Sequence, residues 1–129
     1  MRLVVHLHIP REHKDQALAF YSEKLGFPMT HGAISVWPSD EVELQLKYVD
    51  GVVAPQAYSL FSLGFDGDIS SRCAEWIQRG VEFKAVYMHP GGLTAVIQDP
   101  FGNLMEFEGD DGGAISILEW QEYGFFKRF

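Results

Sequence analysis

Alternation of apolar and polar positions, interrupted by stretches of helical spacing, sets out the first half of the chain. Residues 3–9 (LVVHLHI) alternate strictly, which predicts a strand with one buried face. Residues 15–27 (DQALAFYSEKLGF) carry an apolar stripe at helical spacing, and Gly26 is the residue expected at a left-handed helix end. Residues 29–38 and 41–49 predict further strands. The first half therefore reads strand–helix–strand–strand–strand, with one strand weakly marked.

The same order returns after a linker at 50–55. Asp68 is a good N-cap for the helix of this second half. The elements expected are a strand at 57–65, a helix at 69–79, and strands at 82–89, 93–98 and 103–108. We predict an α+β fold of two βαβββ modules that share one sheet. Residues 1–129 form a single domain, with module 1 at about 1–50, module 2 at about 56–109 and a C-terminal extension at 110–129.

The strand pattern also sorts the side chains between two faces of the predicted sheet. If the helices cover the apolar faces, the other faces line a concave side. That side would carry His6, His8, Glu43, Gln45, Lys47, Tyr58, Leu60, Ser62, Leu104 and Glu106. Imidazole, carboxylate, amide and aromatic groups that converge in a cup indicate a ligand site.

Charge and composition narrow the partners. The 129 residues are 47% hydrophobic and 22% charged, as in a folded globular protein, and the formal net charge is −8. Binding to nucleic acid and to anionic membranes is led by basic clusters, so we expect neither as a partner. A cationic or neutral small molecule, or a divalent metal, is compatible with this charge.

Cysteine usage and the lack of long apolar runs bear on the compartment. Cys73 is the single cysteine, so no intrachain disulfide can form, and its helical spacing from Ile69 and Ile77 predicts a small buried hydrophobe. No stretch has the length of a membrane span or the pattern of a secretory leader. We expect a soluble cytoplasmic protein.

Three segments resemble the vicinal oxygen chelate superfamily, also called the glyoxalase/bleomycin-resistance/dioxygenase fold. They are the histidine of VVHLHIP, the helix ALAFYSEKLGF with its exit, and DPFGNLMEFEG near the end. The resemblance covers residue 1 to about residue 109. It implies two βαβββ modules whose strands curl into an open half-barrel with a concave ligand cup, commonly paired as a homodimer.

The resemblance also implies a divalent metal (Zn, Ni, Mn, Co or Fe) in the cup, held by a first-strand and a last-strand residue of each module. Carried over by position, these ligands fall on His6, on Gln45 with Glu43 as the alternative two residues away, and on Glu106. The fourth falls on Leu60, which cannot bind a metal. The usual set of four is therefore at best three.

Two interpretations of the polar residues stay open. His6 and His8 lie on one side of a strand, so with Glu106 they could form a two-histidine, one-carboxylate metal set, with Gln45 as a weak fourth donor. Alternatively, the histidines are neutral cavity residues and Glu106 acts as a catalytic base or holds a cationic ligand. Tyr58 is a candidate donor at the pocket rim.

Two function hypotheses follow from the resemblance. The first is a small-molecule binding protein of the bleomycin-resistance type, which holds a bulky, cationic or aromatic ligand without a metal. The second is a metal-dependent lyase, isomerase, epimerase or dioxygenase of the same superfamily. Lactoylglutathione lyase activity is disfavoured, because Pro10 stands where a basic residue is usual and Arg11 is displaced by one position.

Two groups of residues outside the resemblance complete the predictions. His13, His31 and His89 fall in loops or at a helix start, where solvated side chains are the rule. The C-terminal extension concentrates aromatic residues that must cover something, which we expect to be a subunit interface or the helix side of the fold. These residues are Trp120, Tyr123, Phe125, Phe126 and Phe129.

Overall fold

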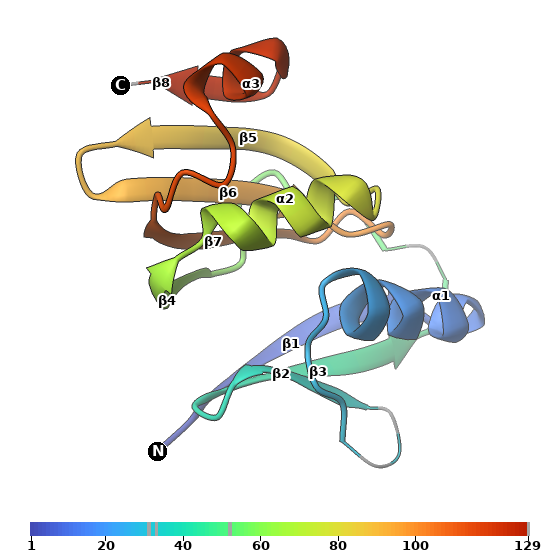
Figure 1. Cartoon of the computed structure of the whole chain (residues 1–129). Coiled ribbons are helices and arrows are strands. Elements are labelled where there is room, and N and C mark those ends of the chain that lie inside the picture. The colour runs from blue at the N-terminus through green and yellow to red at the C-terminus, as the bar shows by residue number, and fades with distance from the viewer. Residues whose placement is uncertain (31, 33, 52, 129) are drawn as a thin grey trace. The chain divides into compact units, whose positions relative to one another are not determined.

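Strands arranged in two sheets dominate the computed structural model, which describes residues 1–30, 32, 34–51 and 53–128. One sheet has three strands and the other has five. They belong to two compact units: unit 1 is Met1–Pro55 with Pro100–Asn103, and unit 2 is Gln56–Asp99 with Leu104–Phe129. The fold is thus mixed α+β, as predicted, and each unit is described separately (Figure 1).

Unit 1 contains the three-stranded sheet, in the order β1-β3-β2, with β1 parallel and β2 antiparallel to β3. A helical stretch covers one of its faces (Figure 1). The elements are β1 (Leu3–Pro10), η1 (Arg11–His13), α1 (Lys14–Leu18), η2 (Ala19–Lys24), β2 (Ser35–Ser39) and β3 (Val42–Val49). Helix α1 continues directly into η2, which has π-helical geometry, and Gly26 follows with a φ of 76°, as expected at a helix end.

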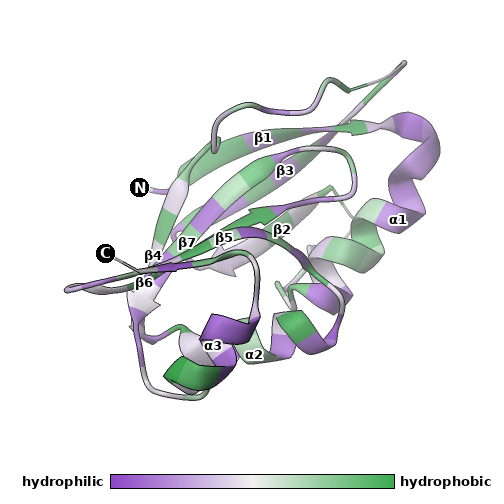
Figure 2. Cartoon of the chain, turned by 90° about the horizontal axis from the view of Figure 1, so that it is seen from above, coloured by the Kyte–Doolittle hydropathy of each residue, from purple (hydrophilic) through white to green (hydrophobic). Residues whose placement is uncertain are grey.

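The core of unit 1 lies between the helical stretch and the sheet. Leu7, Ile9 and Leu44 from the strands and Ala17 and Tyr21 from the helical stretch are all 0% exposed. The alternation that predicted β1 and β3 thus corresponds to one buried face and one polar face, visible as alternating hydropathy bands along both strands (Figure 2).

Unit 2 has the predicted strand–helix–strand–strand–strand order, followed by an additional helix and strand. Its sheet has the order β4-β7-β6-β5-β8, with β4 parallel to β7 and β8 parallel to β5. The elements are β4 (Ser62–Asp68), α2 (Ser70–Gln78), β5 (Glu82–His89), β6 (Gly92–Gln98), β7 (Leu104–Asp110), α3 (Ile117–Glu122) and β8 (Phe126–Arg128). None of the helices in the described part of the chain has the length and apolar character of a membrane-spanning segment.

Aromatic packing fills the core of unit 2. Trp76 of α2 is 1% exposed and packs on Phe107 of β7, with ring centroids 5.3 Å apart. The C-terminal extension packs on its own unit: Trp120 is 0% exposed and stacks on Phe126, and Phe125 stacks on Phe83. Helix α3 lies on the same side of the five-stranded sheet as α2 (Figure 2). Phe129 lies outside the described residues.

Two details of the strand prediction need correction. The strand expected at 29–38 is present as β2 over Ser35–Ser39 only, and Met29 makes an isolated antiparallel bridge to Val36. Unit 1 therefore has three strands among its described residues instead of four. The strand expected at 57–65 begins only at Ser62, and Tyr58 is 83% exposed. A side chain without packing partners gives little reason to hold the backbone extended against the sheet.

Candidate functional site

One face of the sheet in unit 1 carries His6, His8 and Gln45. His6 and Gln45 are register partners on the parallel strands β1 and β3, and His8 is the partner of Lys47. Leu7 and Ile9, which alternate with the histidines, are buried, whereas both histidines are exposed and Gln45 is half-buried. The three predicted site residues of unit 1 therefore lie side by side on the face opposite the core. We call this surface the open face of unit 1.

Glu43 on the same face is fully engaged by its neighbours. Ser35 Oγ donates to Oε2 at 2.7 Å, Arg2 Nε donates to Oε1 at 2.8 Å, and Gln45 Nε2 donates to Oε2 at 3.1 Å. The residue is only 6% exposed. These hydrogen bonds, that of Ser35 first, hold the pKa of Glu43 at about 2, so the carboxylate stays ionised at neutral pH. Glu43 is thus tied into the sheet.

Arg2 links Glu43 to an aromatic residue at the end of the open face. Its guanidinium carbon lies 5.8 Å from the ring centroid of Trp37, within the range of a cation–π contact. Sequence reasoning did not assign Arg2, Ser35 or Trp37 to the site. The strand alternation could have indicated two of them. Arg2 continues the series of His6 and His8 along one strand face, and Trp37 follows Ser35 by two positions and so shares its face.

The corresponding face of unit 2 carries Glu106. Glu106 is half-buried on β7, between Ser62 of β4 and Val96 of β6 in the strand register. Its neighbours along β7, Met105 and Phe107, are 0% exposed, so Glu106 projects from the face opposite the core. We call this surface the open face of unit 2.

The register revises the fourth position derived from the family pattern. In unit 1 the first-strand residue opposite Gln45 is His6, and in unit 2 the first-strand residue opposite Glu106 is Ser62. Leu60 instead lies at the level of Leu104, to whose carbonyl oxygen its N–H donates at 2.8 Å. The two modules thus place a hydroxyl, and not a leucine side chain, at the position equivalent to His6. Leu60 and Tyr58 are exposed residues ahead of β4.

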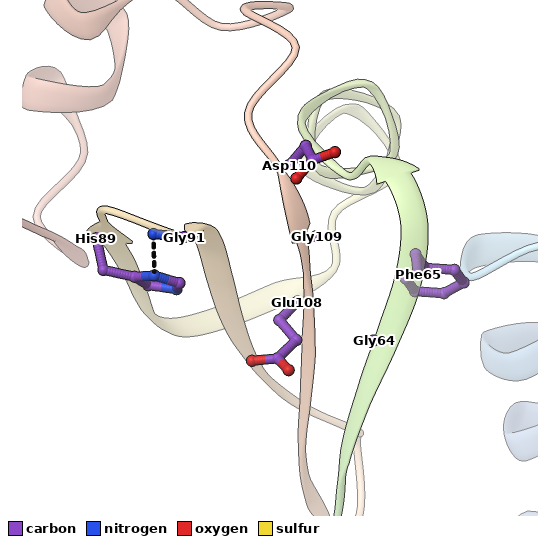
Figure 3. Close-up of a pocket in the computed structure, with 7 residues that line it drawn as sticks. All are labelled: Gly64, Phe65, His89, Gly91, Glu108, Gly109 and Asp110. Atoms are coloured by element: carbon purple, nitrogen blue, oxygen red, sulfur yellow. Dashed lines mark hydrogen bonds between the residues drawn. The ribbon is translucent and has the colours of Figure 1, made fainter.

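A shallow hollow of about 320 Å³ lies at the end of the same sheet, lined by Gly64, Phe65, His89, Gly91, Glu108, Gly109 and Asp110 (Figure 3). The prediction of a solvated His89 was wrong, because this residue is half-buried. Its Nδ1 accepts from the N–H of Gly91 at 3.2 Å, and its Nε2 lies 3.0 Å from Thr94 Oγ1. Neutral His89 therefore carries its proton on Nε2. Both ring nitrogens of His89 are therefore engaged, and the other polar side chains that line the hollow are the carboxylates of Glu108 and Asp110.

The turn before β7 is bound to the strand of the histidines. Asn103 Nδ2 donates to the backbone carbonyl of His8 at 3.0 Å, and Phe101 stacks on His13 with ring centroids 5.9 Å apart. His13 is exposed, as predicted, and His31 lies outside the described residues. The DPFGN sequence thus provides more than a tight turn, because Phe101 and Asn103 are part of unit 1 and contact η1 and β1 there.

The donor set fits a tightly held divalent metal poorly. The four positions that correspond in register hold an imidazole, an amide, a hydroxyl and a carboxylate, and only His6 and Glu106 are strong ligands. Within the described ranges of either unit, no three His, Cys, Asp or Glu side chains are grouped to hold a metal ion. His6, His8 and Gln45 belong to unit 1 and Glu106 to unit 2. That these four surround one ligand remains a prediction.

Cys73 is excluded as a nucleophile. It is 0% exposed on α2, and burial, together with the nearby carboxylates of Asp68 and Asp111, raises its pKa to about 12. At neutral pH the thiolate form is negligible, so the sulfur behaves as the small buried hydrophobe expected from its spacing.

Comparison with known proteins places this geometry in a family. The model of the Glyoxalase/Bleomycin resistance protein/Dioxygenase superfamily matches residues 3–107. The solved structure of UcmS2 is 30% identical, with 84% of this chain and 97% of that chain covered and a TM-score of 0.59. No curated protein sequence matches.

Two more distant structures show the fold alone. TnmS3, described as an antibiotic binding protein from Streptomyces sp. CB03234, is 24% identical, covers 86% of this chain and 98% of its own, and has a TM-score of 0.62. The oxidase ChaP-H2 is 19% identical over 87% of this chain and 96% of that chain, with a TM-score of 0.62. From the extent of the family match and the two modules with equivalent strand register, the chain belongs to the Glyoxalase/Bleomycin resistance protein/Dioxygenase superfamily.

Proposed function

We propose that this protein binds a bulky aromatic, cationic small molecule in the manner of bleomycin-resistance proteins. The observation that carries the proposal is the set of side chains at the four equivalent strand positions: His6, Gln45, Ser62 and Glu106. Three of these side chains carry an imidazole, an amide and a hydroxyl, which form hydrogen bonds, and the fourth is a carboxylate that suits a ligand cation. Such a set suits recognition of an organic molecule better than metal coordination.

Net charge and one related structure support a cationic organic ligand. The net charge of −8 favours a cationic ligand, and TnmS3 is described as binding an antibiotic.

A dye titration tests this proposal. Proflavine, a planar aromatic cation, should quench tryptophan fluorescence saturably with one site per chain, because Trp37 belongs to the open face of unit 1. Anthraquinone-2-sulfonate, an aromatic anion of similar size, should bind far more weakly. Glu106→Gln should weaken proflavine binding about tenfold or more, as expected when a cation loses a charge-assisted partner. Absence of saturable binding by any aromatic cation would overturn the proposal.

A metal-dependent lyase, isomerase, epimerase or dioxygenase is the second candidate. It is favoured by the retained pair of His6 and Gln45 in direct register and by Glu106 as carboxylate ligand or base. Metal analysis of protein purified without chelator separates the candidates. About one equivalent of a divalent ion, lost in both His6→Ala and Glu106→Ala, would support the enzyme.

The family resemblance further supports a homodimer as the assembled form. The C-terminal extension at 110–129, or tail, is a weak candidate for the dimer interface, because Trp120 and the rings around it pack within unit 2. Light scattering at micromolar concentration measures the mass directly, and a mass near 14.6 kDa would identify a monomer.

A further inference from the structure

We infer that Glu43 is a positioning residue that locks the Gln45 side-chain amide, so that the ligand site presents a hydrogen-bond acceptor beside His6. The inference deepens the proposed function and rests on it, because it specifies which ligands the site selects. It predicts a preference for molecules with an N–H or O–H donor at this point over analogues in which that donor is blocked.

The orientation of the amide follows from the chemistry of its partner. An ionised carboxylate can only accept hydrogen bonds, so the group of Gln45 that faces Glu43 must be the NH₂. Gln45 Nε2 lies 3.1 Å from Glu43 Oε2. Because the carboxamide is planar, Oε1 then points along its other branch. Among the described residues, no hydrogen bond to Oε1 is found.

Glu43 is itself held from two other directions and cannot turn to follow the amide. Arg2 binds Oε1 at 2.8 Å, and Ser35 binds Oε2 at 2.7 Å. Arg2 lies in turn over the Trp37 ring. Both oxygens of Glu43 thus accept from fixed donors, and the Gln45 NH₂ is the third donor of this group.

The free oxygen lies on the surface that the ligand would use. Gln45 is the register partner of His6, and neighbouring strands place such partners roughly 5 Å apart on the same face. An exposed imidazole beside a fixed amide oxygen forms a two-point polar contact. A rigidly held acceptor without a partner disfavours ligands that bury it unsatisfied, and this is a strong source of discrimination.

A matched pair of dyes tests the selectivity. Proflavine and acridine orange are both acridinium cations, but the amino groups of acridine orange are fully methylated and donate no hydrogen bond. We expect proflavine to bind the wild-type protein about fivefold or more tightly. The ratio of the two dye affinities should fall towards one in Glu43→Gln, whose amide lets Gln45 rotate, and in Gln45→Leu, which removes the acceptor.

Glu41→Gln is the matched control, since Glu41 is exposed on the neighbouring turn and its side chain makes no hydrogen bond or ion pair with any residue that the structure describes. It should keep the wild-type ratio. A ratio near one in the wild-type protein, or a ratio unchanged in Glu43→Gln and Gln45→Leu, overturns the inference while the proposed function stands. If neither dye binds, the proposed function itself fails.

A measurement without ligand tests the lock directly. In ¹⁵N-labelled protein, the Gln45 side-chain NH₂, assigned from the signal missing in Gln45→Leu, should exchange slowly and resonate downfield in one proton because it donates to a carboxylate. Glu43→Gln should return it to the position of solvated glutamines. If Glu43→Gln does not fold, Gln45→Leu still supplies the dye comparison. A solvent-like Gln45 signal in the wild-type protein overturns the inference whatever the dyes do.

Discussion

Glu43 shows how a carboxylate that could bind a ligand can instead be fully hydrogen-bonded to neighbouring side chains. A carboxylate on the polar face of β3 is a natural candidate for metal or substrate, and it stands two residues from Gln45. Three donors from Ser35, Arg2 and Gln45 already occupy it. A buried carboxylate with satisfied hydrogen bonds contributes order to the site and leaves recognition to the residue that it orients.

Protonation of Glu43 should destabilise the protein at low pH. The folded pKa of about 2 lies below the ordinary value of 4.5, so the stabilisation is complete above about pH 4.5 and is lost as the pH falls towards 2. The free energy of unfolding of the wild-type protein should therefore exceed that of Glu43→Gln at neutral pH and approach it between these values. Denaturant unfolding measured across this range gives the difference. The control Glu41→Gln should leave it unchanged, and a Glu43→Gln deficit independent of pH would contradict the prediction.

Residue positions could be inferred from sequence where the strand is regular. The alternation in β1 and β3 correctly separated His6, His8 and Gln45 from the buried Leu7 and Leu44. In β4 the family pattern gave a position two residues too early: β4 and β7 pair in regular register from Ser62 to Gly64, and the N–H of Leu60 donates to the carbonyl oxygen of Leu104. The position opposite Glu106 is consequently Ser62 and not Leu60. The pairing of two side chains from strands far apart in the sequence, such as Arg2 with Glu43, cannot be predicted from the local sequence pattern.

At the scale of elements, helix α2 is held to the segment that leads into the tail. Asp68 Oδ1 accepts from the Ser70 N–H at 2.7 Å, from Ser70 Oγ at 2.6 Å and from the Gly112 N–H at 2.9 Å. The hydrogen bond from Ser70 is the main reason that the pKa of Asp68 is lowered. The prediction of Asp68 as the N-cap was wrong by one residue, since the N-cap is Ile69, and the bond to Gly112, which spans 44 residues, was not predicted.

Replacing Asp68 should weaken both the start of α2 and the C-terminal extension. We expect Asp68→Ala to lower the free energy of unfolding by about 1–2 kcal/mol, the usual cost of losing a side chain that accepts hydrogen bonds at a helix start. Hydrogen exchange should accelerate at both α2 and the segment around Gly112. Asp66→Ala is the control, since Asp66 is exposed and its side chain forms no hydrogen bond within the described part of the chain. Faster exchange confined to α2 would show that the tail does not depend on Asp68.

The tail should behave as part of the core of unit 2. Trp120 of α3 is 0% exposed, whereas Leu118 on the same helix is 71% exposed. Trp120→Ala should therefore cost about 3–5 kcal/mol of unfolding free energy, the typical loss for a large buried aromatic side chain. Leu118→Ala should change it by less than about 0.5 kcal/mol. Similar unfolding midpoints for the two variants in denaturant would contradict the assignment of the tail to the core.

At the scale of the whole molecule, charge acts beyond any single contact. The chain has 10 basic and 18 acidic residues, and the resulting charge of −8 attracts cations before they reach the site. The fold itself does not determine the ligand, since related structures include both an antibiotic binding protein and an oxidase. Charge and the polar groups of the open faces therefore have to carry the selectivity that the scaffold leaves undetermined.

Long-range attraction should appear as a salt-dependent association rate for proflavine. The screening length shrinks from about 10 Å at 0.1 M salt to about 3 Å at 1 M, so the rate should fall several-fold over that range, with less change in the dissociation rate. Stopped-flow fluorescence measures both rates. Neutralising three exposed carboxylates in the triple variant Glu41→Gln, Asp66→Asn, Glu122→Gln reduces the charge from −8 to −5, since −8 + 3 = −5, and should flatten the salt dependence. An association rate equal at low and high salt would mean that the cation is recognised only on contact, and selectivity would then rest with Glu106 and the locked amide of Gln45.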